Sequence, residues 1–503
     1  MKFLLLLILK LCVLGVTAQY TYFNNTYGEF GDQETEVISN VVVVGDIIYL
    51  FGGIDNDQDP FSFLLRAIDN QGETIIENTV PINNSLTLIG DCQAVSPINP
   101  NKFVYTQATV QGELKGYVTI YDELLDTVWM KTYNLFSSQT YFRSNIVDES
   151  GIIILGEDAS FSNATGTFIL KIDFDGNIVW SNLLHNVNEE MVHVNENVIT
   201  LTDGYLLGGN KQGQFTAMLT KTDLEGNVEW EYYADNFEND EGEQADTRAY
   251  RLAQLPNGDI VGAHMVWYEY YGTQPWNNQD PSWYRSLHLS KINLEDSITT
   301  YWEHNYFTDQ EFSGSNLWKI LPTEDNGVIA MGANEVYAEN AWVAKIDSSG
   351  ALEWFNFYSL DISQTQETYY PYDIEQTSDG GYIIVGEYFS YNEDNFKKSW
   401  VMKIDACGDT QRQGCDYVGI QESIQSKQFK IYPNPANTYF QLEGKTLSVG
   451  DRIEVIDMYG RVVIQEEWIP NGMIDIDELS SGLYQVIVYN KSGSFYSKSL
   501  VVE

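Results

Sequence analysis

Histidine, serine and cysteine, the side chains most often used for catalysis, occur in this chain without the neighbours that catalysis needs. The five histidines, at positions 185, 193, 264, 288 and 304, belong to no metal-binding or nucleophile motif. The patterns G-x-S-x-G and H-E-x-x-H and the P-loop are also missing. The 72 acidic residues are too many for their spacing along the chain to identify a glycosidase pair, which needs a particular separation in space. No catalytic residue is therefore predicted.

Acidic residues alternate with other residues at positions 55 to 59, as they do at the start of a calcium-binding loop. Asp55, Asp57 and Asp59 have the spacing of oxygen ligands, but Pro60 stands where glycine is required. Arg66 stands where the bidentate glutamate should be. An exposed acidic loop is the favoured interpretation, so no metal site and no cofactor are predicted, and calcium stays the alternative at this place.

Aromatic residues gather with Asn, Gln and Asp between positions 264 and 284. Planar rings beside amides and carboxylates can stack on a sugar and hydrogen-bond its hydroxyl groups. The alternative is that these aromatics cover the hydrophobic base of a loop. The predicted ligand-binding residues are Trp267, Tyr270, Tyr271, Trp276, Trp283 and Tyr284.

An internal repeat defines the elements that must position these residues. Lys-x-Asp followed by glycine and then tryptophan begins at Lys171, Lys221 and Lys345, and weaker copies bring the total to seven. The Asp or Asn of the seven copies lies at 69, 122, 173, 223, 293, 347 and 405, and the long step from 223 to 293 contains the aromatic cluster. A period of this length indicates small units that must stack on one another to bury their apolar faces.

A glycine, a short run of β-forming residues and a second glycine precede most copies, as in Gly151-Ile-Ile-Ile-Leu-Gly156 and Gly381-Tyr-Ile-Ile-Val-Gly386. Such runs indicate buried strands, and the Asp-x-x-Gly segments between apolar runs indicate hairpins. Each unit has room for four strands, which is the content of a propeller blade. The sequence therefore predicts an all-β fold, a seven-bladed β-propeller over residues 19–415 followed by a small C-terminal β-sandwich.

The seventh copy lacks an apolar outer strand, and the residues that follow position 19 near the N-terminus offer a replacement. We expect residues 20 to 24 to complete the last blade and close the ring, which removes an open sheet edge.

The recurrent tryptophans at 129, 180, 230 and 354 have a fixed place after the hairpin, which favours packing between blades over stacking on a ligand. The recurrent aspartates at 173, 223, 347 and 405 are expected to cap turns. His288 aligns with large apolar residues of other copies, so a packed histidine is expected there.

The composition excludes one large class of partners. Lys and Arg number 27 against 72 Asp and Glu, which gives a net charge of −45. A polyanion of this kind cannot supply the cationic contacts that dominate nucleic-acid binding. A hydrophobic content of 43% with 14% aromatic residues places the chain among folded proteins.

The N-terminus has the layout of a secretory signal peptide over residues 1–18, with Lys2, an apolar run and the small-residue ending Val16-Thr17-Ala18. No later apolar stretch is long enough to predict a transmembrane segment. In an oxidising compartment Cys407 and Cys415 are predicted to form a short-loop disulfide, which leaves Cys92 as a buried thiol.

Three ordered motifs lie in residues 429–503, after a polar linker over 416–428. They are Tyr432-Pro433-Asn434-Pro435-Ala436, Asp457-Met-Tyr-Gly460-Arg461 and Ser481-Gly482-Leu-Tyr484. This segment resembles the type A sorting domain of type IX secretion cargo. The resemblance implies the type IX secretion machinery as a partner and a location outside a Gram-negative cell, either secreted or on the outer surface. It also implies removal of the domain, with release or attachment to surface lipopolysaccharide. A β-sandwich that binds a ligand is the alternative.

Three functions stay open on the sequence alone. The favoured one is a non-enzymatic secreted or surface-anchored propeller that binds a glycan or a surface protein on a rigid scaffold. The second is a carbohydrate-active hydrolase or lyase that uses carboxylates at the mouth of the channel. The third is a structural adhesion component. Fold-level analogy does not choose among them, because propellers serve all three purposes.

Overall fold

The structure is a computed structural model that describes residues 22–410 and 430–502 apart from short segments. In the first range these segments are 28–33, 57–61, 82–85, 89–93, 112, 134, 137–139, 159–165, 185–192, 212–215, 235–245, 248–249, 271–281, 295–298, 307–314, 335–339, 359–366 and 391–396. In the second they are 444–446, 448, 450, 457–461, 471, 478, 481 and 490–494. The chain divides into two compact units, Met1–Gly414 and Cys415–Glu503. The predicted signal peptide and linker lie outside the described residues.

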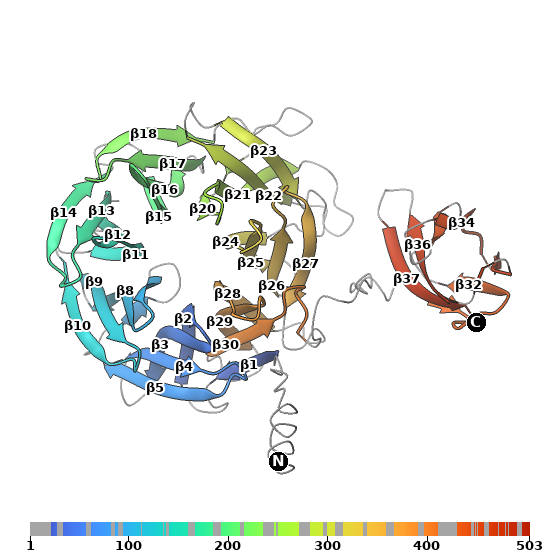
Figure 1. Ribbon diagram of the computed structural model, residues 1–503, viewed down its shortest axis with the longest axis horizontal. Coiled ribbons are helices and arrows are strands. Elements are labelled where there is room, and N and C mark those ends of the chain that lie inside the picture. The colour runs from blue at the N-terminus through green and yellow to red at the C-terminus, as the bar shows by residue number, and fades with distance from the viewer. Residues whose placement is uncertain are drawn as a thin grey trace, which may run out of the picture. The chain divides into compact units, whose positions relative to one another are not determined.

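The described strands of the first unit form seven antiparallel sheets, the blades, arranged as a ring around a central channel (Figure 1). Blade 1 contains β2 (Glu34–Val44), β3 (Ile47–Asn56), β4 (Ser62–Ile68) and β5 (Thr74–Pro81). Blade 2 contains β6 (Leu86–Leu88), β7 (Ala94–Asn99), β8 (Lys102–Gln111), β9 (Glu113–Asp122) and β10 (Thr127–Thr132). Blade 3 contains β11 (Thr140–Asp148), β12 (Gly151–Asp158), β13 (Thr167–Ile172) and β14 (Ile178–Leu183).

The remaining blades follow the same plan. Blade 4 contains β15 (His193–Leu201), β16 (Gly204–Lys211), β17 (Thr216–Thr222) and β18 (Val228–Tyr233). Blade 5 contains β19 (Asp246–Thr247), β20 (Arg251–Gln254), β21 (Ile260–Tyr270), β22 (Ser282–Asn293) and β23 (Thr299–Tyr306). Blade 6 contains β24 (Ser315–Pro322), β25 (Val328–Asn334), β26 (Asn340–Ile346) and β27 (Leu352–Tyr358). Blade 7 combines β28 (Glu367–Gln376), β29 (Tyr382–Ser390) and β30 (Lys397–Ile404) with β1 (Phe23–Tyr27). The all-β propeller prediction is confirmed.

The ring is closed by the first strand of the chain, as predicted, although the strand lies a few residues later than expected. β1 pairs antiparallel with β30, with Phe23 opposite Lys403 and Tyr27 opposite Ser399. The Tyr27 hydroxyl donates to the carbonyl of Gly72 in blade 1 at 2.7 Å. Tyr133 and Tyr358 make the same contact to the glycine of the next blade's turn. β1 therefore acts as the outer strand of blade 7.

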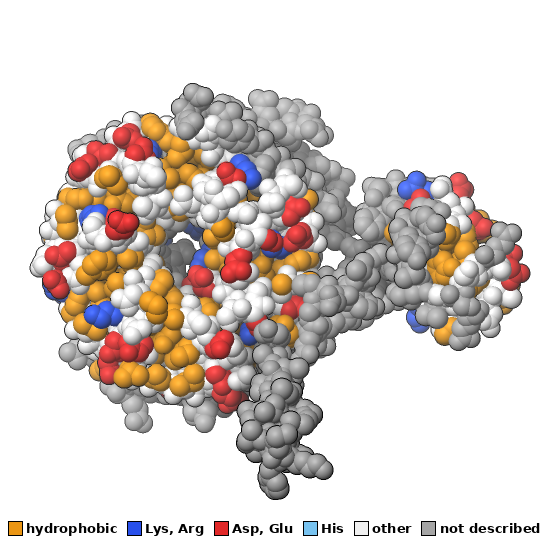
Figure 2. Space-filling view, in the orientation of Figure 1, with side chains coloured by type: hydrophobic (Ala, Val, Ile, Leu, Met, Phe, Trp, Pro, Cys, Tyr) orange, Lys and Arg blue, Asp and Glu red, His pale blue; other side chains and the backbone are white. Residues whose placement is uncertain are grey.

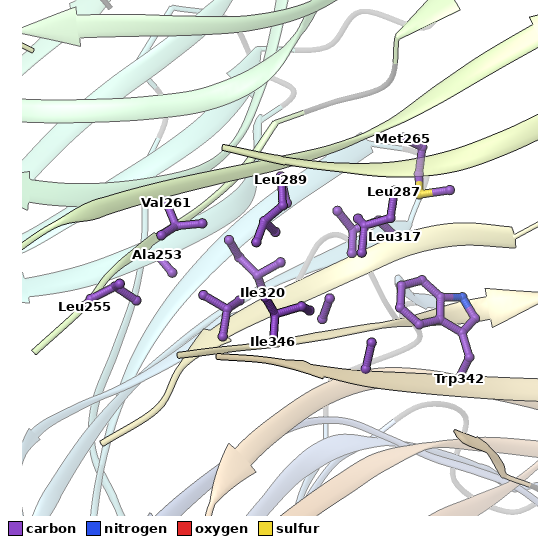
Figure 3. Packing of buried hydrophobic residues seen from close by; sticks show 14 residues of the cluster. Ala253, Leu255, Val261, Met265, Leu287, Leu289, Leu317, Ile320, Trp342 and Ile346 are labelled. Carbon is purple, nitrogen blue, oxygen red and sulfur yellow. The ribbon is translucent and has the colours of Figure 1, made fainter. Parts of the chain in front are cut away.

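The hydrophobic core lies between the blades. Each of seven buried clusters takes its residues from two neighbouring blades, so one cluster occupies each interface around the ring. Figure 3 shows the cluster between blades 5 and 6, where Trp342 and Ile346 face Leu287 and Leu289. Both faces of a blade are thus covered, which explains why β4 and β13 are buried at every position.

The recurrent aspartates cap the turn between the third and fourth strands, as predicted. Oδ1 of Asp173 accepts the backbone N–H groups of Asp175 and Asn177 at 3.0 and 2.7 Å. The glycine of this turn, Gly176, has a φ of 76°, a conformation that favours glycine. The same bonds recur at positions 223, 347 and 405.

The recurrent tryptophans pack between blades, which confirms the structural interpretation of these residues. The indole N–H of Trp129 donates to the carbonyl of Phe174 at 3.1 Å, and that of Trp354 donates to Ala406 at 3.0 Å. In both cases the acceptor is in the Asp-capped turn of the next blade. Side-chain amides add to this contact, because Nδ2 of Asn182 donates to the carbonyl of Glu225 at 2.7 Å.

In the five copies that contain it, the recurrent lysine forms an ion pair inside its blade. Nζ of Lys403 lies 2.8 Å from Oδ2 of Asp379, and the two side chains are 1% and 5% exposed. Equivalent pairs join Lys171 to Asp148 at 2.6 Å and Lys345 to Asp325 at 2.8 Å. Each aspartate belongs to the turn between the first and second strands. Removing one partner of the buried Lys403–Asp379 pair leaves an uncompensated charge and costs about 3–5 kcal/mol.

Blade 5 differs from the others in containing a pair of buried histidines. His264 on β21 is the register partner of His288 on β22, and the two rings stack with centroids 4.6 Å apart. Burial, together with the neighbouring His288, holds the pKa of His264 well below its usual value. Burial also lowers the pKa of His288, to about 4. The expectation of a packed histidine at position 288 is confirmed.

The second unit is a small β-sandwich. One sheet contains β31 (Lys430–Tyr432), β32 (Tyr439–Glu443) and β35 (Ile474–Asp475). The other contains β34 (Val462–Glu467), β33 (Arg452–Ile456), β36 (Gly482–Tyr489) and β37 (Phe495–Val502) in that spatial order. Phe440, Val455, Val486 and Leu500 are buried between the sheets.

The closing strand gives a first prediction. Deleting residues 23–27 should destabilise the ring by at least about 3 kcal/mol, because Phe23 is buried in the cluster between blades 7 and 1. Tyr27→Phe, which removes one hydrogen bond, should cost only about 1 kcal/mol. Thermal unfolding of the two variants measures the difference, and an unchanged melting temperature in the deletion would contradict the assigned closure.

The histidine pair gives a second prediction, on pH. The folded-state pKa of both rings is lowered, so the unfolded chain binds more protons below about pH 6.5. Stability should be complete above that pH and fall toward pH 4 by about 1.4 kcal/mol per pH unit for each histidine. Chemical denaturation at pH 7, 6 and 5 tests this expectation. His264→Leu/His288→Leu should flatten the dependence, whereas an equally steep loss in that variant would assign the acid sensitivity to other groups.

Candidate functional site: the central channel

A cavity of about 350 Å³ lies in the channel, and the innermost strands of all seven blades contribute to its wall. Figure 2 shows the hollow at the centre of the ring, with acidic and basic side chains around it. The charged wall residues are Arg143, Arg251, Lys319, Asp373 and Glu375, and the aromatic ones are Trp318 and Tyr372. Ser39, Asn40, Ser96, Ser144, Asn145 and Asn197 add smaller polar groups.

β-bulges in the innermost strands place these side chains in the wall. In β24 the register with β25 shifts between Leu317 and Lys319, and in β28 the register with β29 shifts between Pro371 and Asp373. A regular strand presents only alternate residues to one side, whereas a bulge turns an extra residue outward. Trp318 and Lys319 therefore both line the cavity, although they are neighbours in the chain.

Each bulge lies opposite a glycine of the second strand. In β25 the partner of Leu317 is Gly332, and in β29 the partner of Pro371 is Gly386. A Cβ on either glycine would overlap a carbonyl oxygen of the bulged strand, that of Asn316 or Tyr370. The corresponding glycines in blades 1, 3 and 4 are Gly52, Gly156 and Gly209. The second glycine of the repeated motif is thus required by the approach of the channel strand.

The two blades without this glycine have a different channel strand. In blade 2 the position belongs to Gln107, and the innermost strand is divided there into β6 and β7. In blade 5 it belongs to His264, and the innermost strand is divided into β19 and β20. The register between the two parts shifts by four residues in blade 2, whereas in blade 5 it shifts by one, as it does in the blades with the glycine.

Lys319 forms the centre of a charged cluster between blades 6 and 7. Its Nζ contacts Oδ1 of Asp373 and lies 3.2 Å from Oε1 of Glu375. Oδ2 of Asp373 accepts the backbone N–H of Val41 in blade 1 at 3.0 Å. Asp373 thus joins three consecutive blades and is a structural member of the wall.

Electrostatics within the cluster separate the roles of its members. Burial would lower the pKa of Lys319, but the charges of Asp373 and Glu375 outweigh it and raise this pKa above its ordinary value. Burial raises the pKa of Glu375, and Lys319 only partly opposes that rise. About a third of the Glu375 side chain is exposed. Glu375 is therefore the carboxyl group of the cluster that is accessible to a ligand.

Arg143 is held in a second cluster, on the blade 3 side of the cavity. Its Nε donates to Oε1 of Glu157 at 2.8 Å, and its Nη2 donates to the hydroxyl of Tyr141 at 3.1 Å. The guanidinium carbon also lies 5.0 Å from the centroid of the Tyr141 ring. These contacts fix the guanidinium plane on blade 3.

Asparagine side chains connect the channel strands of neighbouring blades. Nδ2 of Asn197 donates to the carbonyl of Tyr250 at 2.7 Å, while its Oδ1 accepts the N–H of Leu252 at 3.0 Å. Nδ2 of Asn145 donates to the carbonyl of Ala94 at 2.7 Å and to the hydroxyl of Thr106 at 2.9 Å. The wall is held by hydrogen bonds from blade to blade, which makes it a preorganised surface.

The predicted aromatic site lies elsewhere, in the hairpin between β21 and β22. Trp267 and Tyr270 are on β21, and Trp283 and Tyr284 are on β22. Tyr284 pairs in register with Tyr268, and Trp283 pairs with Glu269. Tyr271 and Trp276 lie outside the described residues. The insertion thus lengthens one hairpin of blade 5, and ligand binding by its aromatics stays a prediction.

The predicted calcium-like segment and the predicted disulfide lie partly outside the residues that the structure describes. Of the calcium-like segment, Asp55 is on β3, while Asp57, Asp59 and Pro60 are not described. Cys407 takes part in a disulfide, and its predicted partner Cys415 is outside the described residues. Within the described part of the chain, no group of three or more His, Cys, Asp or Glu side chains is placed to hold a metal ion.

Described residues of two of the three sorting motifs, Ala436 and Gly482, both pair with Val502. Tyr432, Pro433, Asn434 and Pro435 are exposed, while the next residue, Ala436, is buried and forms a parallel bridge with Val502. The hydroxyl of Tyr484 donates to the carbonyl of Ser480 at 2.8 Å. Gly482 begins β36, and Gly460 and Arg461 lie outside the described residues.

The residues of the channel wall were missed by motif reasoning, because no known motif contains them. A usable signal was present in the repeat itself. The charged residues Lys319 and Asp373 interrupt apolar strands at the same distance before the Gly-strand-Gly motif. Polar residues at a repeated position that faces the ring axis are expected to line the channel.

The bulge arrangement gives a third prediction. Gly386→Ala should cost at least about 3 kcal/mol of stability, because the new Cβ would overlap the Tyr370 carbonyl within a packed blade. Gly380→Ala, in the same blade, should cost only about 1–2 kcal/mol, because it meets an unfavourable φ of 82° but nothing within 4 Å. Equal costs in denaturant unfolding would show that the close approach is not what selects the glycine.

Comparison with solved structures gives similarity at low identity. The chain is similar to a europium-containing methanol dehydrogenase at 9% identity and a TM-score of 0.39, over 76% of this chain and 92% of that chain. It is similar to the α-L-arabinanase of Penicillium chrysogenum complexed with arabinobiose at 9% identity and a TM-score of 0.40, over 64% and 98%. It is similar to the WD40 domain of SCAP from fission yeast at 8% identity and a TM-score of 0.34, over 76% of this chain and 98% of that chain. Similarity at this level says nothing about activity.

Comparison by sequence concerns the second unit. No curated protein matches the chain. In the part of the chain that the structure describes, no helix is long and apolar enough to cross a membrane. Residues 430–503 match the family of secretion system C-terminal sorting domains, which confirms the resemblance stated from the three motifs. The protein therefore carries a type IX sorting domain and is a secreted or cell-surface protein of a Gram-negative bacterium, exported by the type IX machinery.

Proposed function

We propose that this protein is a non-enzymatic binding protein of the cell exterior that holds a small polar ligand in the central channel. The observation that carries the proposal is the cavity of about 350 Å³, whose wall is built by all seven blades and contains charged, amide, hydroxyl and aromatic side chains. This volume is near the lower end of the range for small-molecule sites. A sorting domain at residues 430–503 delivers the ring to the place where such ligands occur.

The wall supports binding because its side chains are already positioned. Asp373, Asn197 and Asn145 are fixed by hydrogen bonds to neighbouring blades. A ligand that meets ordered groups loses less conformational entropy on binding. The interfaces between blades are fully buried, so the ring can act as a rigid frame.

A second contact with the ligand is proposed for the long hairpin of blade 5. Strands alternate in direction within a blade, so the β21–β22 connection leaves at the end of the channel opposite the Asp-capped turns. Aromatic residues there could contact parts of a larger glycan or protein that extend from the channel. This contact would widen specificity without replacing the channel site.

Glu375 favours one alternative function, a secreted carbohydrate-active hydrolase. Its raised pKa and partial exposure are properties of a general acid, and Asp373 lies in the same cluster. Against this role, Asp373 is occupied by Lys319 and by the backbone of Val41, which are structural duties. Turnover of a glycan that is abolished by Glu375→Gln while binding persists would establish the enzyme instead.

The fourth prediction tests the binding site with the mature exported chain on an array of glycans and extracellular proteins. Ser144→Tyr places a phenol ring in the cavity wall and should abolish binding of the ligand that the unmodified chain selects. Thr127→Tyr adds the same ring at an exposed position on β10 and should leave binding unchanged. Both variants must melt at the temperature of the unmodified chain, so that a loss of binding is not caused by unfolding.

Two outcomes would contradict the proposal. Retained binding in Ser144→Tyr together with its loss in Trp276→Ala or Trp283→Ala would transfer the site to the hairpin. If the unmodified chain binds nothing on the array, that result would favour a structural adhesion component.

A further inference from the structure

We infer that the channel recognises the end of a neutral saccharide chain, with the terminal sugar between blades 6 and 7. This inference rests on the proposed channel site and specifies its ligand. It follows from the charge balance of the wall, from its mixture of donors, acceptors and rings, and from the closed perimeter of the ring.

The described wall itself carries three cations, Arg143, Arg251 and Lys319, and two carboxylates, Asp373 and Glu375. Glu157, which pairs with Arg143 but does not line the cavity, supplies the third negative charge and brings the balance to zero. A charged ligand would need to leave water for a site that offers no net compensation, which is costly. The net charge of −45 on the whole chain adds a long-range repulsion against anions. A neutral ligand avoids both penalties.

Ionic groups that neutralise one another can still bind hydroxyl groups. The ammonium of Lys319 has three N–H donors, of which Asp373 and Glu375 take two, and the carboxyl group of Glu375 offers acceptors on its exposed third. Hydrogen bonds to charged groups are stronger than those between neutral groups. A sugar, which carries a donor and an acceptor on every hydroxyl, matches such a wall.

Aromatic rings lie directly beside these polar groups. Trp318 precedes Lys319 in the bulge of β24, and Tyr372 precedes Asp373 in the bulge of β28. The two rings meet edge to face, with centroids 5.9 Å apart and an interplanar angle of 90°. Rings at right angles give a sugar an apolar corner for its C–H groups, while its hydroxyls reach Lys319 and Glu375.

The ring restricts how a polymer can reach this corner. Every side of the cavity is formed by a blade, since all seven innermost strands contribute to the wall. A chain cannot enter sideways, as it can in an open groove. Only an end of the polymer, or a free short oligosaccharide, can pass along the axis.

The test uses isothermal titration of the mature exported chain with malto-, cello-, xylo- and manno-oligosaccharides. At least one neutral series should bind, and oligogalacturonate and chitosan oligomers should bind at least about tenfold more weakly. Within the series that binds, the affinity per mole of oligosaccharide should be the same for short and long members, because each molecule has one recognised end. Affinity that rises in proportion to chain length would overturn recognition of ends, because internal units would then be the ligand.

Variants assign the contact to named side chains. Glu375→Gln and Trp318→Leu should each weaken binding of the selected oligosaccharide by about tenfold or more. Glu123→Gln, at an exposed turn outside the channel, should leave it unchanged. Unchanged affinity in both channel variants would overturn the inference.

The inference and the proposed function fail in different ways. Tighter binding of a charged series, or no binding by any neutral series, overturns the saccharide inference alone if Ser144→Tyr still blocks another ligand on the array. Binding that is insensitive to Ser144→Tyr overturns the channel site and the inference together.

Discussion

The close approach of the innermost strand to a glycine of the second strand is the interaction on which the channel depends. In four blades a backbone carbonyl of the innermost strand occupies the space that a Cβ would fill, at Gly52, Gly156, Gly332 and Gly386. The resulting bulge brings two consecutive side chains into the wall, which supplies Trp318 with Lys319 and Tyr372 with Asp373. In blades 2 and 5, where Gln107 and His264 occupy the glycine position, the innermost strand is divided into two named strands.

The repeat that builds the ring is a set of contacts between units. A capped turn in one blade receives the tryptophan or tyrosine of the blade before it, as Gly176 receives Tyr133. The last of these contacts is made by Tyr27, although its strand comes from the start of the chain. Because each blade is covered on both faces, the stability of the ring is distributed over seven similar interfaces. A scaffold of this kind leaves the axis free to differ in chemistry from blade to blade.

Much of the architecture follows from the sequence, because it is repeated. The period, the glycine pairs and the Asp turns predict blades and closure, and strand β1 differs from the expected segment by only a few residues. The three C-terminal motifs identify the sorting domain. The channel cluster could not be predicted in the same way, since Lys319, Asp373 and Val41 are joined only when the ring closes. Its members come from blades 6, 7 and 1, and although Lys319 and Asp373 hold the same place in their repeats, the sequence does not show that they pair across a blade interface or that Val41 joins them. Conversely, the aromatic hairpin was conspicuous in sequence, but none of its described residues lines the channel cavity.

A crystal structure of the exported protein with a bound neutral oligosaccharide tests binding at the axis of the ring most directly. The expected result is a terminal sugar in the channel, against Trp318 and Tyr372 and within hydrogen-bond distance of Lys319 or Glu375. An oligosaccharide on the β21–β22 hairpin of blade 5, with only solvent in the channel, would contradict it.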